Sequence, residues 1–67
     1  MIEISLNGAP HQLAPGQNVA QLVASLGLTD QAIAVALDRQ VVPRQRWNEH
    51  PVQPGAQIEI VRAIGGG

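Results

Sequence analysis

The sequence predicts an α+β fold in which one main helix packs on one face of a mixed sheet of four to five strands. Two observations lead to this prediction. Apolar residues alternate with polar or small ones in short segments at both ends of the chain and in its middle, as they do in half-buried strands. A single segment near residues 18–26 shows the i, i+3, i+4, i+7 spacing of a helix with one apolar face.

The first two strands are expected to form a hairpin. Apolar residues alternate over residues 2–6, and Asn7-Gly8 follows. This dipeptide is the strongest short hairpin signal, because both residues tolerate a positive φ. A two-residue loop then places residues 9–13 in the second strand. Pro10 has no N–H to donate, so this strand should lie at an edge of the sheet.

The helix is expected over about residues 18–26. Asn18 suits its N-cap, and Gln21 stands at the reciprocal position of a capping box. Gly27 suits the left-handed C′ position of a Schellman-type stop. The apolar face consists of Val19, Leu22, Val23 and Leu26.

Three more strands complete the sheet. Alternation predicts one over residues 33–37, and Asp38-Arg39-Gln40 reads as a short turn into Val41-Val42. Residues 44–50 read as an irregular surface segment with one helical turn. A last strand contains Ile58 and Ile60 and ends near Ala63.

The order strand, strand, helix, strand, short strand, strand favours one topology. The helix must cross over one face of the sheet, and such crossovers are right-handed. The simplest packed result places the first and last strands side by side under the helix, which is the β-grasp, or ubiquitin-like, arrangement. We therefore expect a single β-grasp domain over residues 1–63 and a flexible glycine-rich tail over residues 64–67.

Composition excludes several classes of function. The 67 residues carry a formal net charge of -1 with four scattered arginines, which argues against binding to nucleic acid. The absence of cysteine excludes disulfides, thiolate metal sites and a thiol nucleophile. The absence of lysine excludes a Schiff base and a side-chain amine that accepts an isopeptide bond. No apolar stretch approaches the roughly 20 residues that span a membrane, so we expect a cytoplasmic protein.

The C-terminal tail is the main candidate site. Ile64, Gly65, Gly66 and Gly67 follow the last strand, and glycines add nothing to the stability of the domain because their ordering cost is high. Glycine alone lets a backbone lie in a channel too narrow for a Cβ, so Ile64, Gly65 and Gly66 are predicted to thread into a partner enzyme. The Gly67 carboxylate then becomes the reacting group, after activation as an acyl adenylate. The alternative is an incidental terminus.

Two residues before the tail are candidates for partner docking. Alternation from Ile60 points Val61 away from the helix, toward an open face of the sheet, where an exposed apolar patch would bind a partner. Arg62 lies next to the tail and is predicted to guide docking. Arg44 and Arg46, like Arg62 itself, are expected to be solvated.

The remaining chemical groups are weaker candidates. His11 and His50 are predicted to be structural or loop residues, and two histidines without cysteine do not support a metal site. Glu3 and Glu59 lie on adjacent predicted strands, but no cleft-forming segment accompanies them. Trp47 is predicted to cover one end of the core near Val41 and Val42, the alternative being a contact with a partner.

The chain resembles the ThiS-type sulfur carriers of thiamine biosynthesis. The resemblance covers essentially the whole sequence, although the third glycine of the tail and Asp38 differ from the commonest pattern. A terminal Gly-Gly is shared by many ubiquitin-like proteins, whereas the Val41-Val42-Pro43-Arg44 run and the short length are more discriminating. The matching segments are residues 2–8, 19–23, 35–44 with Trp47, 54–61 and 63–67.

The resemblance implies a carrier that is modified and catalyses nothing itself. An adenylating partner of the ThiF type would activate Gly67 with ATP and magnesium, so the chain itself would bind no cofactor. A cysteine persulfide donor would supply sulfur to form a thiocarboxylate, and a thiazole synthase of the ThiG type would accept it. Gly66 and Gly67 carry over as the functional dipeptide, with Gly65 as an additional spacer. The alternatives are the small subunit of molybdopterin synthase, which is usually longer, a ubiquitin-like modifier of target lysines, and a passive binding module.

Overall fold

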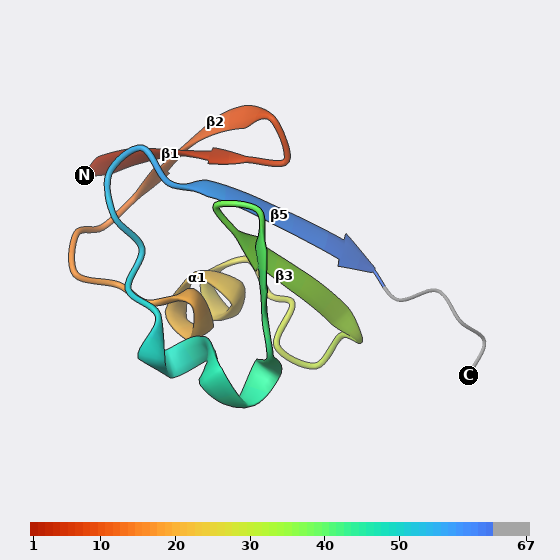
Figure 1. Ribbon diagram of the computed structural model, residues 1–67. Coiled ribbons are helices and arrows are strands. Elements are labelled where there is room, and N and C mark those ends of the chain that lie inside the picture. Colours follow the sequence, from red (N-terminus) through yellow and green to blue (C-terminus); the bar gives the residue numbers. More distant parts are fainter. Residues whose placement is uncertain (63–67) are drawn as a thin grey trace.

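The computed structural model describes residues 1–62 as a five-stranded sheet covered on one side by two helical segments (Figure 1). The strand order is β2-β1-β5-β3-β4, and β1 and β5 are parallel while the other pairs are antiparallel. The elements are β1 (Ile2–Leu6), β2 (Ala9–Leu13), α1 (Val19–Ser25), β3 (Ile33–Leu37), β4 (Gln40–Val42), the 3-10 helix η1 (Arg44–Glu49) and β5 (Gln57–Arg62). The predicted mixed sheet with one main helix, and with its first and last strands adjacent, is confirmed.

The N-terminal hairpin forms as the sequence predicts. Ile2 lies opposite Leu13, which is the register of a two-residue loop. Asn7 has a φ of 50° and Gly8 a φ of 83°, so both loop residues are left-handed, as a type I′ turn requires. β2 is an edge strand, where the missing N–H of Pro10 leaves no gap in the interior of the sheet.

Helix α1 has the two end structures that its sequence predicts. At its start, the Gln21 amide donates to Asn18 Oδ1 at 2.8 Å and the Asn18 amide donates to Gln21 Oε1 at 2.9 Å, which completes the capping box. At its end, the Leu28 amide donates to the Val23 carbonyl at 3.1 Å. This is the long bond of a Schellman motif, with Gly27 at a φ of 72°.

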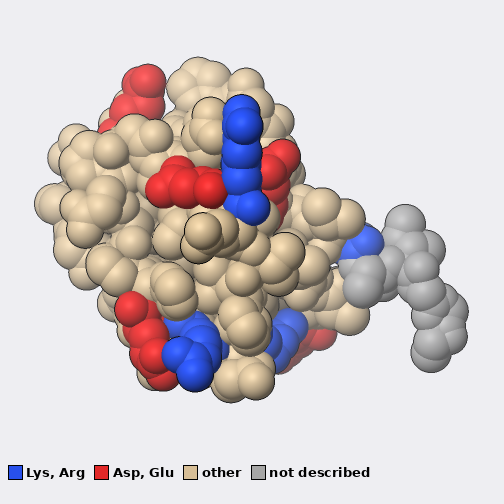
Figure 2. All heavy atoms as spheres, viewed as in Figure 1, with Lys and Arg blue, Asp and Glu red and all other residues tan. Residues whose placement is uncertain are grey.

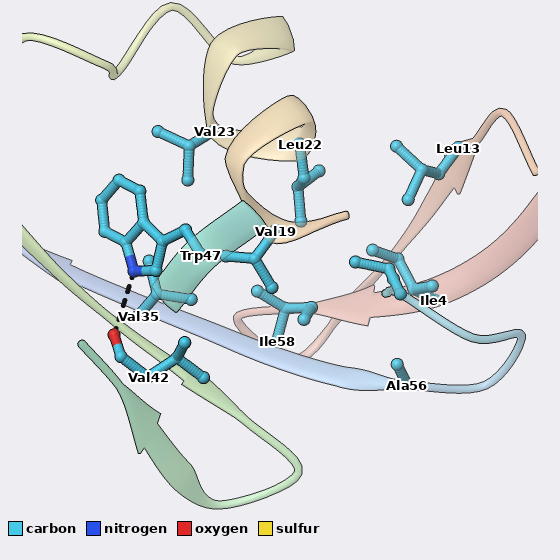
Figure 3. Packing of buried hydrophobic residues seen from close by; sticks show 11 residues of the cluster. Ile4, Leu13, Val19, Leu22, Val23, Val35, Val42, Trp47, Ala56 and Ile58 are labelled. Atoms are coloured by element: carbon cyan, nitrogen blue, oxygen red, sulfur yellow. Dashed lines mark hydrogen bonds between the residues drawn. The ribbon is translucent and has the colours of Figure 1, made fainter. Parts of the chain in front are cut away.

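The core lies between α1 and the sheet (Figure 3). Leu22 and Ile58 face each other across it, and 0% and 1% of their surfaces are exposed. Trp47 of η1 closes one end, with its indole N–H donating to the Val42 carbonyl at 2.9 Å. The prediction that Trp47 covers the core near Val42 is confirmed.

The turn between β3 and β4 is tighter than expected. The predicted turn included Gln40, but Gln40 pairs with Leu37 and begins β4. The loop is therefore the dipeptide Asp38-Arg39, with φ values of 49° and 72°. No glycine signals this conformation, and Asp38 is held by two bonds to Gln57: its amide donates to the Gln57 carbonyl at 2.8 Å, and Oδ1 accepts from the Gln57 amide at 2.9 Å.

Arg44 is exposed, as predicted, but it also makes contacts that the sequence did not predict. Its guanidinium donates to the carbonyls of Thr29 at 3.0 Å and Gln31 at 2.6 Å. The same group lies over the Trp47 ring, 4.6 Å from the centroid, which is cation–π geometry. Arg44 therefore ties the segment before β3 to the start of η1. Arg46 remains at the surface as expected, beside Glu49 at 3.6 Å.

Within residues 1–62, no helix is long and apolar enough to cross a membrane.

Candidate functional site

The end of β5 is the candidate site, because it leads directly into the predicted tail. β5 lies in the middle of the sheet between β1 and β3. Ala63, the predicted end of the domain, and Ile64, Gly65, Gly66 and Gly67, the predicted threading and reacting residues, lie outside the described residues. Their roles therefore stay predictions, and the structure defines the strand to which they are attached.

The neighbouring strands β3 and β1 pair with β5 over different lengths. On the β3 side the ladder continues to the end of the strand, where Arg62 lies opposite Ile33. On the β1 side the strand pairing ends earlier, with Leu6 opposite Ile58. The Asn7 side chain then continues the contact: its Oδ1 accepts from the Ile60 amide at 2.8 Å, and its Nδ2 donates to the Ile60 carbonyl at 3.3 Å. Sequence reasoning assigned Asn7 only to the turn.

Val61 points away from the helix, as predicted. Val61 is 64% exposed, and Val41 on β4 is 73% exposed. Ala34 lies opposite Val61 and Ala36 opposite Val41, so the two valines share one side of the sheet with two small residues between them. We call Ala34, Ala36, Val41, Glu59 and Val61 the open face. The structure thus places two exposed valines on this face, and the docking role of Val61 stays a prediction.

Arg62 does not belong to the open face. Successive residues of a strand point to opposite sides, so Arg62 lies on the same side as Ile60, and it is paired with Ile33. The side chain is exposed. The two predicted docking residues thus flank the start of the tail from opposite sides of the sheet, and a partner that contacts both must surround the end of β5.

Charge is mixed over the face that Figure 2 shows, where acidic and basic side chains alternate around the molecule. No large field of one sign covers this face, which fits the low net charge of the sequence. This face of the described residues therefore offers little electrostatic steering of a charged partner.

The other candidate groups are kept apart by the fold. His11 lies on the edge strand β2 opposite Ile4, whereas His50 follows η1, and its backbone carbonyl accepts from the Val19 backbone N–H at 3.0 Å. Ser5 of β1 is level with Gln57 of β5, so Glu3 and Glu59 are displaced by four residues, or about 13 Å at about 3.3 Å per residue. Residues 1–62 contain no cluster of three or more metal-ligating side chains.

This arrangement attaches the predicted tail to a well-held strand. The strand before the tail is central, hydrogen-bonded on both sides as far as Ile60, and backed by the core through Ile58. A rigid attachment lowers the entropy that must be lost when the following residues bind in a partner.

The comparisons with known proteins agree on one family. The model of the ThiS family matches residues 4–67. The chain is 38% identical over 66 residues to the sulfur carrier protein ThiS of Escherichia coli (strain K12), covering 98% of this chain and 100% of that protein. It is 36% identical over 66 residues to a thiazole synthase of Magnetococcus marinus, covering 98% of this chain but 20% of that protein.

A solved structure supports the same assignment. The crystal structure of the thiamine biosynthesis protein ThiS from Geobacter metallireducens superposes with a TM-score of 0.86 at 26% sequence identity. The superposition covers 98% of this chain and 100% of that one. The family model, the full-length relative and the shared fold together show that the chain belongs to the ThiS family.

Proposed function

We propose that this chain is the sulfur carrier of thiamine biosynthesis, with the Gly67 carboxylate as the group that carries sulfur. The observation that supports this most is the family match, which runs through the C-terminal residue. The relative from E. coli is itself named a sulfur carrier protein. The structure adds a central strand, held by hydrogen bonds on both sides as far as Ile60, that leads into the glycines.

The chemistry requires activation, because a carboxylate is a poor acyl donor. A Gly67 oxygen attacks the α-phosphorus of ATP, pyrophosphate leaves, and an acyl adenylate forms. A persulfide then attacks the acyl carbon and AMP leaves. A second thiol cleaves the sulfur–sulfur bond and releases the thiocarboxylate. Magnesium and cationic groups that stabilise the phosphate charge come from an adenylating partner of the ThiF type.

The thiazole synthase partner has separate support. Two relatives named thiazole synthase contain a stretch that is similar to 98% of this chain and makes up 20% of their own length. A carrier-like segment and a thiazole synthase thus occur in one polypeptide, which favours a ThiG-type protein as the acceptor of the sulfur. The family resemblance is the support for the ThiF-type partner, the persulfide donor and a cytoplasmic location.

The docking surface is the open face around Val61, with Arg62 on the other side of the strand. Val61 is exposed and lies three residues before the first residue of the threading segment, Ile64. A partner that receives the whole tail therefore brings its own surface up to Val61. The small side chains of Ala34 and Ala36 let it approach the sheet closely.

Mass spectrometry of the C-terminal peptide tests the proposal. The full chain is incubated with ATP, magnesium and the cognate adenylating enzyme, and a sulfur donor is then added. Replacement of one carboxylate oxygen by sulfur is the expected result. A stable isopeptide adduct on a target protein would instead indicate a ubiquitin-like modifier, and an unchanged mass would refute the carrier function.

Tail variants locate the reaction. Deletion of Gly67 removes the reacting carboxylate from its place, and Gly66→Leu places a bulky side chain where only a glycine backbone fits. Both should abolish loading while the thermal unfolding midpoint is unchanged. Gln53→Leu, at an exposed loop position, is the matched control and should be loaded normally. Normal loading of Gly66→Leu would contradict the narrow channel.

A further inference from the structure

The two tight turns of the sheet share an unusual feature: the first residue of each sends its side chain to the backbone of β5. Asn7 and Asp38 are the first residues of two-residue turns, and both have a left-handed φ. Asp38 accepts from the Gln57 amide, at the start of β5. Asn7 pairs with Ile60, close to its end. The two side chains thus hold the same strand at opposite ends.

The side-chain amide of Asn7 takes the place that the next peptide group of β1 would occupy beside β5. The Asn7 backbone N–H donates to the Ile58 carbonyl at 2.9 Å, so the parallel ladder is intact up to this point. The positive φ then turns the main chain away toward Gly8. In a longer β1, the next carbonyl would accept from the Ile60 amide and a later N–H would donate to the Ile60 carbonyl. The Asn7 side chain supplies both an acceptor and a donor in their stead.

Neither of these bonds is needed to close the hairpin. The β1–β2 register, with Leu6 opposite Ala9, is set by the two-residue loop, and glycine adopts the same left-handed φ. What the side chain adds is a hydrogen-bond partner for both backbone groups of Ile60, a residue that lies opposite Val35 on β3. Without it, the β1 side of Ile60 is open to water, and β3 alone holds the last residues of the strand.

We infer that Asn7 is a positioning residue that fixes the direction in which the chain leaves β5 toward its reacting terminus. This inference rests on the proposed function, because the direction of the terminus matters only if a partner must receive it. Ile60 is four residues before Ile64. Conformational freedom of the Ile60 backbone therefore changes the position and direction of every residue that must thread. Asn7 acts before the partner binds, by reducing the conformations that binding must exclude.

The test compares Asn7→Gly with Asp38→Gly. Each variant keeps a residue that tolerates the left-handed φ and removes one side-chain contact to β5, but only Asn7→Gly affects the end next to the tail. Asn7→Gly should raise the apparent KM for the carrier in the adenylation reaction by roughly threefold to tenfold, the range expected for a pair of exposed hydrogen bonds. The kcat should change little, and Asp38→Gly should leave both constants near those of the natural chain.

Unfolding measurements separate positioning from stability. Both variants should lose a similar, small part of their resistance to urea, so a general loss of stability would affect their loading equally. Equal KM values for the two variants, or an unchanged KM in Asn7→Gly, would overturn the inference. Asn7→Asp keeps the acceptor for the Ile60 amide but loses the donor, so its KM should lie between those of the natural chain and Asn7→Gly.

Amide hydrogen exchange gives a readout that does not depend on the partner enzyme. The Ile60 amide should exchange several times faster in Asn7→Gly, whereas in Asp38→Gly the change should appear at Gln57. Unchanged exchange at Ile60 would overturn the inference even if loading proceeds. Failure of the natural chain to be loaded at all would instead refute the proposed function. The two failures are distinguishable, because hydrogen exchange is measured without the partner enzyme.

Discussion

The two sides of the sheet are built from the same strands but are buried to very different degrees. On the helix side, Ile58 and Val35 are each 1% exposed and pack against α1. On the open face, Val61 and Val41 are 64% and 73% exposed. Ile58 and Val61 are three residues apart on β5, so alternation alone sends one into the core and leaves the other in water.

This contrast shows that a small domain can bury one side of its sheet and leave the other exposed to water. A domain of this length buries only about 60% of its unfolded surface, and here the apolar side chains with the greatest burial gather on one side of the sheet. Aliphatic residues that remain on the other side do not contribute to that core. Their position around the strand that leads to the tail is explained by a partner that covers them, as we propose.

The largest expected effect belongs to the helix side. Leu22→Ala should lower the free energy of unfolding by about 2–5 kcal/mol, because Leu22 is 0% exposed and its truncation leaves a cavity. That is a large part of the roughly 3–10 kcal/mol expected for a domain of this size. Urea denaturation followed by circular dichroism measures it. Ile60→Ala serves as the comparison and should cost less, because Ile60 is only half-buried; equal costs would contradict the assigned packing.

An intermediate effect is expected at the end of the core. Trp47→Phe removes the N–H that binds the Val42 carbonyl and should cost about 1–3 kcal/mol, the price of an unmet buried acceptor. The measurement must use circular dichroism, since Trp47 is the only tryptophan. Loading of the variant should stay normal under conditions where it is folded. A selective loss of loading would mean that Trp47 contacts a partner, which was the alternative interpretation of this residue.

Local patterns were sufficient to predict most of the fold. Asn7-Gly8 predicted the hairpin, Asn18 with Gln21 predicted the start of α1, and Gly27 predicted its end. Each of these signals acts within a few residues, so it can be read from the chain directly. The alternation around Ile58 likewise predicted which side of β5 is buried.

Contacts between distant segments were not predictable in this way. The bonds of Arg44 to Thr29 and Gln31 depend on where η1 docks, and no sequence spacing encodes that position. The turn alone was a sufficient reason for an asparagine at position 7. Its hydrogen bond to Ile60, 53 residues away, was therefore not expected. Arg62 was grouped with Val61 by proximity in sequence, whereas the strand places them on opposite sides.

The smallest expected change in stability accompanies the most direct test of the contrast between the two faces. Val61→Asp places a charge on the open face and should change the free energy of unfolding by at most about 1 kcal/mol, the span of strand preferences. Gln53→Asp, which adds the same charge at an exposed loop position, is the control. We predict that the rate of tail loading at low carrier concentration falls about tenfold, equivalent to about 1.4 kcal/mol, in Val61→Asp and is unchanged in Gln53→Asp. Equal loading of the two variants would contradict the assignment of the open face to partner binding.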